Sequence, residues 1–206
     1  MAVLYIEQSD YAKASDLLSQ NLRTFTELNN KQEIASALIN RGVINQRLNN
    51  NEAALKEFQD GLKIAEEAAA PDKVITAQQG LGTVYYQQGK YSEALEWLDK
   101  AWVQAQTRGD KIRMTELLWR KGRVYYSLGD YTRASALADS AAGLAMKLRL
   151  PIMSYLALTL KGRTQRALNE DVLACESFLK AIKEIEHLRG LIAGGEKEQQ
   201  LFVVNP

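Results

Sequence analysis

The sequence contains very few of the residues that form metal sites or nucleophilic catalytic sites. Its 206 residues include one cysteine, Cys175, and one histidine, His187. A structural zinc site takes four ligands, mostly Cys and His, and a nucleophile needs a base within hydrogen-bonding reach. Cys175 and His187 lie twelve residues apart in one predicted helix, too far to meet. We therefore expect no catalytic residue, no metal site, no cofactor and no enzymatic activity, with Cys175 as a buried structural thiol.

Disulfides, a strong charge of one sign and long apolar runs are also missing. A single cysteine excludes an intrachain disulfide, which is typical of a reducing compartment. The formal net charge of +1 gives no general attraction to nucleic acid or to an anionic membrane. No apolar run approaches the roughly 20 residues that span a bilayer, and the first ten residues lack a signal-peptide pattern. The sequence predicts a cytoplasmic protein with no nucleic-acid or membrane partner.

What the sequence does contain is a repeated set of small and aromatic residues. Glycines recur at an interval of 40 residues: Gly42, Gly82, Gly122 and Gly162. Alanine follows twelve places after each of them: Ala54, Ala94, Ala134 and Ala174. In the second and third copies, tyrosines stand three and nine places after the glycine, and a further glycine stands seven places after it. A fixed period of this length indicates an array of one structural unit, an antiparallel helix pair.

In these spacings the sequence resembles the tetratricopeptide repeat (TPR) family, in a variant with a 40-residue period. The resemblance covers almost the whole chain. It implies an all-α fold, an α-α superhelix in which antiparallel helix pairs stack as a solenoid. The first and fourth copies have Asn49 and Asn169 in place of the turn glycine. Because asparagine tolerates the left-handed conformation, we expect these turns to be kept.

The repeats predict how the chain is organised. Residues 1–29 form a partial or capping repeat, and residues 190–206 form a C-terminal connector or capping helix. Between them, residues 30–189 form four helix pairs at about 31–70, 71–110, 111–150 and 151–189. The expected helices span 31–48, 51–69, 72–88, 91–108, 111–128, 131–149, 152–168 and 171–189. Residues 1–29 fit equally a natural cap and the remnant of a longer array.

After His187 the repeat pattern ends, and we expect a break in the helix followed by a new helix from Glu196. The segment from Ile185 to Phe202 resembles the connector that leads into the caspase-like CHAT protease domain of bacterial TPR-CHAT proteins. The resemblance implies an alternative function as the regulatory or sensor arm of a larger bacterial protein. The apolar residues from Leu201 to Val204 also offer a surface for self-association through the array ends.

Without a catalytic constellation, function is expected to come from the concave groove. The resemblance implies that the first helix of each pair lines this groove. The residues it implies for the groove change from neutral and polar in the first two copies to basic and aromatic in the last two, and they include Ile39, Gln79 and Leu160. The predicted partner-binding residues are Tyr86, Trp119, Arg120, Arg123, Tyr126, Arg163 and Arg166.

The chemistry of these residues favours a protein or peptide partner with an acidic segment. Trp119, Arg123 and Tyr126 fall on one face of a helix. Trp, Tyr and Arg often dominate binding energy at interfaces, and Arg makes paired contacts with carboxylates. The alternative is that Trp119 and Tyr126 pack against the adjacent repeat while the arginines are solvated. A clamp for chaperone tails is not expected, because Ile39 and Gln79 stand where that clamp needs Lys and Asn.

Overall fold

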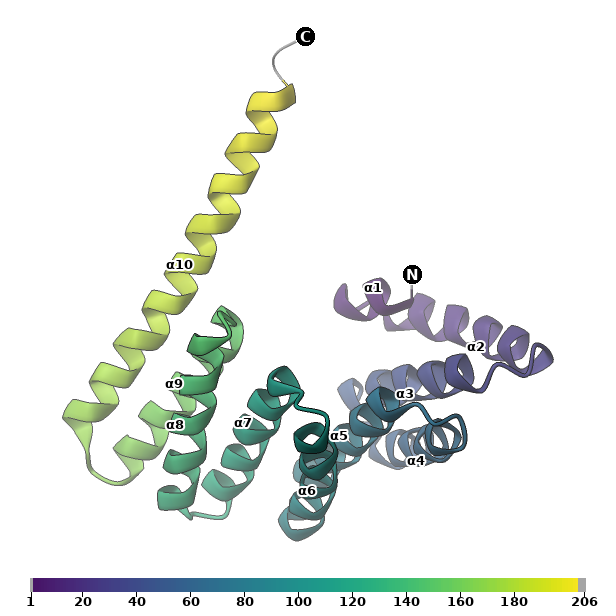
Figure 1. The fold of residues 1–206 in the computed structure, drawn as a ribbon, viewed down its shortest axis with the longest axis horizontal. Coiled ribbons are helices and arrows are strands. Elements are labelled where there is room, and N and C mark those ends of the chain that lie inside the picture. Colours follow the sequence, from purple (N-terminus) through teal and green to yellow (C-terminus); the bar gives the residue numbers. More distant parts are fainter. Residues whose placement is uncertain (1, 204–206) are drawn as a thin grey trace. The chain divides into compact units, whose positions relative to one another are not determined.

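The described part of the chain is built entirely from helices (Figure 1). The computed structural model describes the backbone of residues 2–203 and the side chains of residues 2–190. The helices are α1 (Ala2–Glu7), α2 (Tyr11–Glu27), α3 (Lys31–Arg47), α4 (Asn51–Glu67), α5 (Pro71–Gln87), α6 (Tyr91–Thr107), α7 (Lys111–Ser127), α8 (Tyr131–Lys147), α9 (Pro151–Ala167) and α10 (Asp171–Val203). The prediction of an all-α fold is confirmed.

Every helix from α1 to α9 ends in the same kind of turn, with one residue in the left-handed region. The φ angle is +60° at Asn49 and +64° at Asn169, close to the +73° of Gly89. After α3, the amide of Asn50 donates to the carbonyl of Asn45 at 2.8 Å, and the amide of Asn49 donates to the carbonyl of Gln46 at 3.2 Å. This pair of bonds is a Schellman motif. The expectation that asparagine replaces glycine in these turns is confirmed.

The same turn also joins one helix pair to the next, which the sequence did not predict. Ala69 and Arg149 have φ angles of +48° and +56°. Their turns keep the closing hydrogen bond, since the amide of Ala70 donates to the carbonyl of Ala65 at 2.9 Å. Because these residues leave the helical region, α4 and α8 end two residues earlier than expected.

The chain divides into two compact units at Asp110. In the first, each helix from α1 to α6 packs against the next, and α3 also contacts α5. In the second, α7, α8, α9 and α10 pack in sequence, and α7 also contacts α9. Contacts between alternate helices bring the first helices of successive pairs side by side. Each unit is therefore a stack of antiparallel helix pairs.

Three of the repeat glycines lie where a helix touches its partner within a pair. A Cβ added to Gly42 would lie 2.9 Å from the ring of Phe58, and one added to Gly162 would lie 2.7 Å from the ring of Phe178. At Gly82 the nearest atom is Cγ of Leu98, at 2.9 Å. Each of these partners stands sixteen residues after its glycine. The glycines therefore recur from repeat to repeat because they permit close approach of the two helices.

In the third repeat, the space over the repeat glycine is filled by a residue of the next helix pair. Sixteen residues after Gly122 stands the small Ala138, and the nearest atom to an added Cβ is Cδ2 of Leu160 in the next pair, at 3.0 Å. In the first repeat the large residue is Phe58, and the position corresponding to Leu160 is Gly80. A large side chain in one pair is thus matched by a small one in the neighbouring pair, as close packing requires.

α10 differs from the expectation for the C-terminal part. Instead of a break after His187, one helix of 33 residues continues from Asp171 to Val203. A glycine such as Gly190 lowers helix stability by about 1 kcal/mol without ending the helix. No proline occurs in this stretch of the sequence. The predicted apolar surface from Leu201 to Val204 lies outside the described side chains.

Candidate functional site

Six of the seven predicted contact residues lie on two helices of the second unit. Trp119, Arg120, Arg123 and Tyr126 belong to α7, and Arg163 and Arg166 belong to α9. We call these six residues the arginine–aromatic surface. The seventh residue, Tyr86, lies on α5 in the first unit, where its ring centroid is 5.9 Å from that of Tyr91.

Trp119 is flanked by two arginines of its own helix. Cζ of Arg123 lies 4.8 Å from the Trp119 ring centroid, and Cζ of Arg120 lies 5.9 Å from it. Both distances are within the range of a cation–π interaction. The four-residue spacing places Arg123 on the face of α7 that carries the indole ring.

Trp119 also takes part in the packing of the second unit. Its ring is half-buried and packs against an apolar cluster that includes Ala142 and Leu158. The indole therefore has its position fixed by the core while it also contacts two guanidinium groups. Trp119 therefore packs against the adjacent helices, as the alternative interpretation proposed, and its ring also contacts the arginines of α7.

Tyr126 connects the two helices of the surface. Cζ of Arg163 on α9 lies 4.8 Å from its ring centroid. The ring of Tyr131, which begins α8, lies 5.4 Å away at an angle of 56°. Offset or tilted aromatic pairs at this distance are favourable. Tyr126 therefore brings Arg163 toward the arginines of α7.

The charge of the surface is positive but not uniform. Nη2 of Arg120 lies 2.5 Å from Oε1 of Glu116, one helical turn earlier. Their side chains are 24% and 33% exposed, respectively. Arg163 and Arg166 are exposed on α9. The surface thus holds four arginines, of which Arg120 pairs with Glu116, and arginine makes paired contacts with carboxylates.

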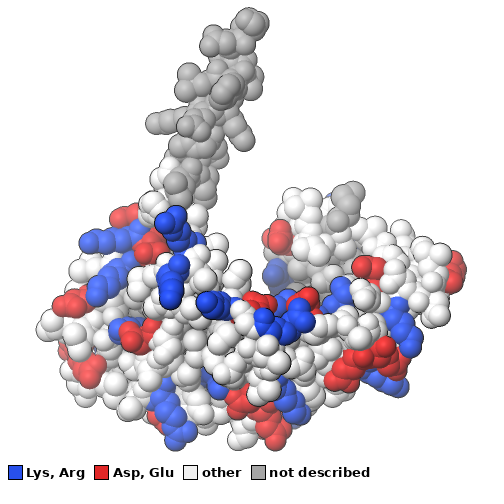
Figure 2. Space-filling view, in the orientation of Figure 1, with Lys and Arg blue, Asp and Glu red and all other residues white. Residues whose placement is uncertain are grey.

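The charge of the chain as a whole is nearly balanced. On the face drawn in Figure 2, Lys and Arg side chains are interspersed with Asp and Glu side chains. That distribution agrees with a formal net charge of +1. Any electrostatic preference for a ligand must therefore be local.

Two residues that the family resemblance assigned to the groove of the first unit are buried instead. Ile39 is 4% exposed and Gln79 is 5% exposed. Ile39 belongs to the apolar cluster around Phe58, and its Cγ1 would lie 2.9 Å from a Cβ added to Gly61. Leu160, also predicted for the groove, is 4% exposed because it fills the space over Gly122. The prediction that these three residues line the groove is therefore wrong.

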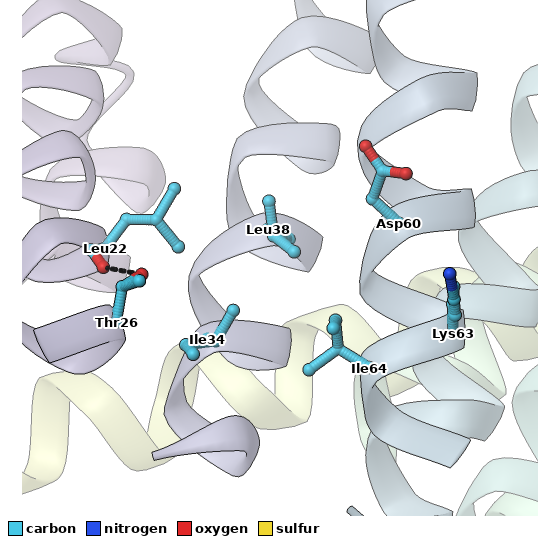
Figure 3. Close-up of a pocket in the computed structure, with 7 residues that line it drawn as sticks. All are labelled: Leu22, Thr26, Ile34, Leu38, Asp60, Lys63 and Ile64. Atoms are coloured by element: carbon cyan, nitrogen blue, oxygen red, sulfur yellow. Dashed lines mark hydrogen bonds between the residues drawn. The ribbon is translucent and has the colours of Figure 1, made fainter. Parts of the chain in front are cut away.

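An apolar hollow in the first unit was not predicted from the sequence (Figure 3). Its volume of about 360 Å³ is at the small end of the range for ligand sites. The residues that line it come from α2, α3 and α4: Leu22, Thr26, Ile34, Leu38, Asp60, Lys63 and Ile64. Figure 3 shows that both charged residues, Asp60 and Lys63, belong to α4, so the charged groups lie on one side of the hollow. The sequence prediction considered only the first helix of each pair. The apolar residues on the second helices α2 and α4, which help to line the hollow, were therefore not considered.

Cys175 lies at the surface of α10, which corrects the prediction of a buried thiol. The corresponding residues Leu55 and Ser135 are half-buried in helices that pack against a following pair. Among residues 2–190, no group of three or more His, Cys, Asp or Glu residues is placed to hold a metal ion. Within the same part of the chain, no helix has the length and apolar character needed to cross a membrane.

Comparison with protein families gives a clear match. The tetratricopeptide repeat model matches three overlapping segments of the chain, residues 1–67, 33–102 and 73–147. A comparison with curated proteins gives no match. The family therefore rests on the repeat model and on the fold.

Several solved structures share the fold. BtubC from P. vanneervenii is 21% identical with a TM-score of 0.79, and the match covers 92% of this chain and 78% of that one. The Rap conjugation gene regulator of plasmid pLS20, solved with a Phr peptide, is 14% identical with a TM-score of 0.78. That match covers 91% of this chain and 52% of the Rap protein, about half its length. A set of nearly identical TPR-like repeats from Podosopora anserina is 15% identical, with a TM-score of 0.68 and coverage of 91% and 92%.

These relatives are TPR-like solenoids, and the helix pairs of this chain have the same architecture. The family model spans residues 1–147, well over half of the sequence. The repeat glycines and left-handed turns account for that match in physical terms. The chain belongs to the tetratricopeptide repeat family.

Proposed function

We propose that the protein is an interaction module that binds a peptide or a helix of a partner protein through the arginine–aromatic surface of α7 and α9. No bond is made or broken in this function. The observation that carries the proposal is the position of the Arg123 guanidinium over the Trp119 ring and of the Arg163 guanidinium over the Tyr126 ring, with each Cζ 4.8 Å from the ring centroid. Two aromatic rings hold guanidinium groups from two different helices.

Stacking prepares the arginines for carboxylates. Contact with a ring helps to hold a guanidinium group in place, and its N–H groups make paired contacts with a carboxylate. Ordering a long side chain on binding costs about 0.5–1.5 kcal/mol, and stacking reduces that loss. We therefore propose an acidic segment as the ligand, with an affinity in the micromolar range, about 8 kcal/mol.

The shared fold gives independent support for this class of function. The Rap regulator with the same fold was solved in complex with a peptide. A stack of helix pairs offers a surface formed by several helices, which suits an extended peptide or a partner helix. The single cysteine and the mixed surface charge support a cytoplasmic protein without a nucleic-acid ligand.

A displayed library of random peptides tests the proposal while the natural partner is unidentified. The library is selected on the wild-type chain, and the enriched peptides are then titrated against the Arg123→Ala/Arg163→Ala variant. We expect enrichment of Asp and Glu, and a loss of affinity of at least tenfold in the variant, since a hydrogen bond to a charged group contributes about 1.5–3 kcal/mol.

The control is a variant that loses the same two positive charges as the arginine variant, at residues outside the arginine–aromatic surface. Lys111 and Lys147 are exposed in the same unit, so Lys111→Ala/Lys147→Ala serves this purpose. The control should bind the selected peptides as the wild type does. Equal affinity of the wild type and the arginine variant for those peptides would refute the assignment of the surface.

A second candidate is a regulatory or sensor arm of a larger bacterial protein, such as a CHAT-type protease. The observation that favours it is the length of α10, because an uninterrupted helix of 33 residues is a stiff connection. Coding sequence beyond Pro206 with a His and Cys dyad would support this candidate. A reading frame that ends at Pro206 would remove it.

A further inference from the structure

α10 carries an apolar stripe that no described residue covers. Val172, Leu179 and Ile182 are 75%, 54% and 49% exposed, respectively, and Cys175 is exposed between them. Their spacing of three, four and three residues places all four on one side of the helix. This is the spacing at which paired helices contact each other.

The repeat itself does not require apolar residues at these positions. The residues that correspond to Val172 in the earlier second helices are Glu52, Ser92 and Thr132, and those that correspond to Leu179 are Gln59, Asp99 and Asp139. All six are polar and exposed. The apolar character of this side of α10 is therefore a departure from the protein's own pattern.

A further helix pair of the usual kind would cover only part of the stripe. Leu62 and Ala142, which correspond to Ile182, are buried in helices that pack against a following pair. The positions of Val172 and Leu179 stay exposed in those same helices, α4 and α8. The surface that covers Val172 and Leu179 must therefore lie along the outer side of α10.

We propose that a second copy of this chain covers the stripe, so that two α10 helices pack against each other in a homodimer. The stripe is nearly symmetric about residue 177, with Val172 and Ile182 at its ends and Cys175 and Leu179 inside. A two-fold axis at this point matches the patch with itself, which is the commonest form of homodimer contact.

The dimer is weak because the stripe is small. A standard interface buries about 800 Å² on each partner, and four partly exposed side chains supply less than that. We therefore expect a dissociation constant in the micromolar range. The inference uses only α10, so its failure and the failure of the arginine–aromatic surface are distinguishable.

Sedimentation of the full chain over about 1–300 µM tests the dimer. The average mass of the wild type should rise from 23.1 kDa toward twice that value. The variant Val172→Glu/Leu179→Asp carries residues found at the same positions in other repeats, and it should remain monomeric. The control Ile152→Glu changes a residue that is 57% exposed on α9, outside the stripe, and should associate as the wild type does.

Crosslinking provides a second measurement on the same variants. Cys175 is the only cysteine, so a bismaleimide can join two chains only through α10. A crosslinked dimer should form in the wild type and be lost in Val172→Glu/Leu179→Asp, with unchanged helix content by circular dichroism. A wild type that stays monomeric at every concentration, or a dimer that persists in the double variant, would overturn the inference.

Discussion

The space around each glycine predicts that a change to alanine has opposite effects on stability at Gly80 and at Gly143. A Cβ added to Gly80 would lie 2.4, 2.5 and 2.6 Å from three ring atoms of Phe58, while one added to Gly42 would lie 2.9 Å from the same ring. The ring is 1% exposed and is held between these two glycines. It therefore has no space into which it can move, and Gly80→Ala should destabilise the protein.

The size of this effect follows from two opposing terms. Overpacking a well-packed core costs about 1–3 kcal/mol. Replacing glycine by alanine inside a helix stabilises the folded state by about 0.5–1 kcal/mol. From the midpoints of these two ranges, we expect Gly80→Ala to lower the free energy of unfolding by about 1 kcal/mol. At Gly143, in α8, an added Cβ meets no atom within 4 Å, so Gly143→Ala should raise it by about 0.5–1 kcal/mol.

Urea unfolding followed by circular dichroism measures both variants against the wild type. A Phe58→Leu background provides a further check, because a smaller side chain leaves room for the new methyl group. The destabilisation by Gly80→Ala should shrink there by at least 0.5 kcal/mol, the coupling typical of residues in contact. If the two alanine substitutions shifted stability in the same direction and by the same amount, the packing argument would be refuted.

Three further predictions concern a turn, a helix cap and a partly buried carboxylate. Arg149→Gly should stabilise the protein by about 0.5–1 kcal/mol in thermal unfolding, because φ is +56° there. Asp130→Ala should destabilise it by about 1 kcal/mol, since this side chain accepts a hydrogen bond from the Arg133 amide at 3.0 Å. Burial raises the pKa of Glu57 above 4.5 even though Arg41 lies 2.7 Å away. The folded state then binds more protons, so stability falls as pH rises through the raised pKa, and urea unfolding of Glu57→Gln between pH 4.5 and 7 should show less of this decline.

The 40-residue period was enough to predict the helix pairs. In the structure, Gly42 and the aromatic residue sixteen places later, Phe58, lie against each other within the first pair. Turn chemistry was readable at Asn49 and Asn169 because asparagine adopts the left-handed conformation with little strain. Local preferences and the repeat pattern agree at these positions, so the sequence alone sufficed.

Prediction failed where a tertiary contact decided the outcome. Nothing in the sequence marks Ala69 and Arg149 as left-handed residues, because neither prefers that conformation. The burial of Ile39 and Leu160 depends on small residues in neighbouring helices, which a pattern confined to one helix does not show. The exposure of Cys175 follows from its place on α10, where no described pair packs over it.

The candidate surface was predictable as a set of residues but not as an arrangement. Helical spacing placed Trp119 and Arg123 together on α7. The stacking of Arg163 on Tyr126 joins two helices, and the ion pair of Arg120 with Glu116 reduces the local charge. Both depend on side-chain conformations that packing selects.

Affinity capture from an extract of the source organism, read by mass spectrometry, tests the central claim most directly. Three forms of the chain are compared: the wild type, an Arg120→Ala/Arg123→Ala/Arg163→Ala variant, and a Lys111→Ala/Arg133→Ala/Lys147→Ala control with the same change in charge. We expect a partner that the wild type and the control capture and the arginine variant does not. Capture of the same partners by all three forms, with equal thermal stability, would contradict binding through the arginine–aromatic surface.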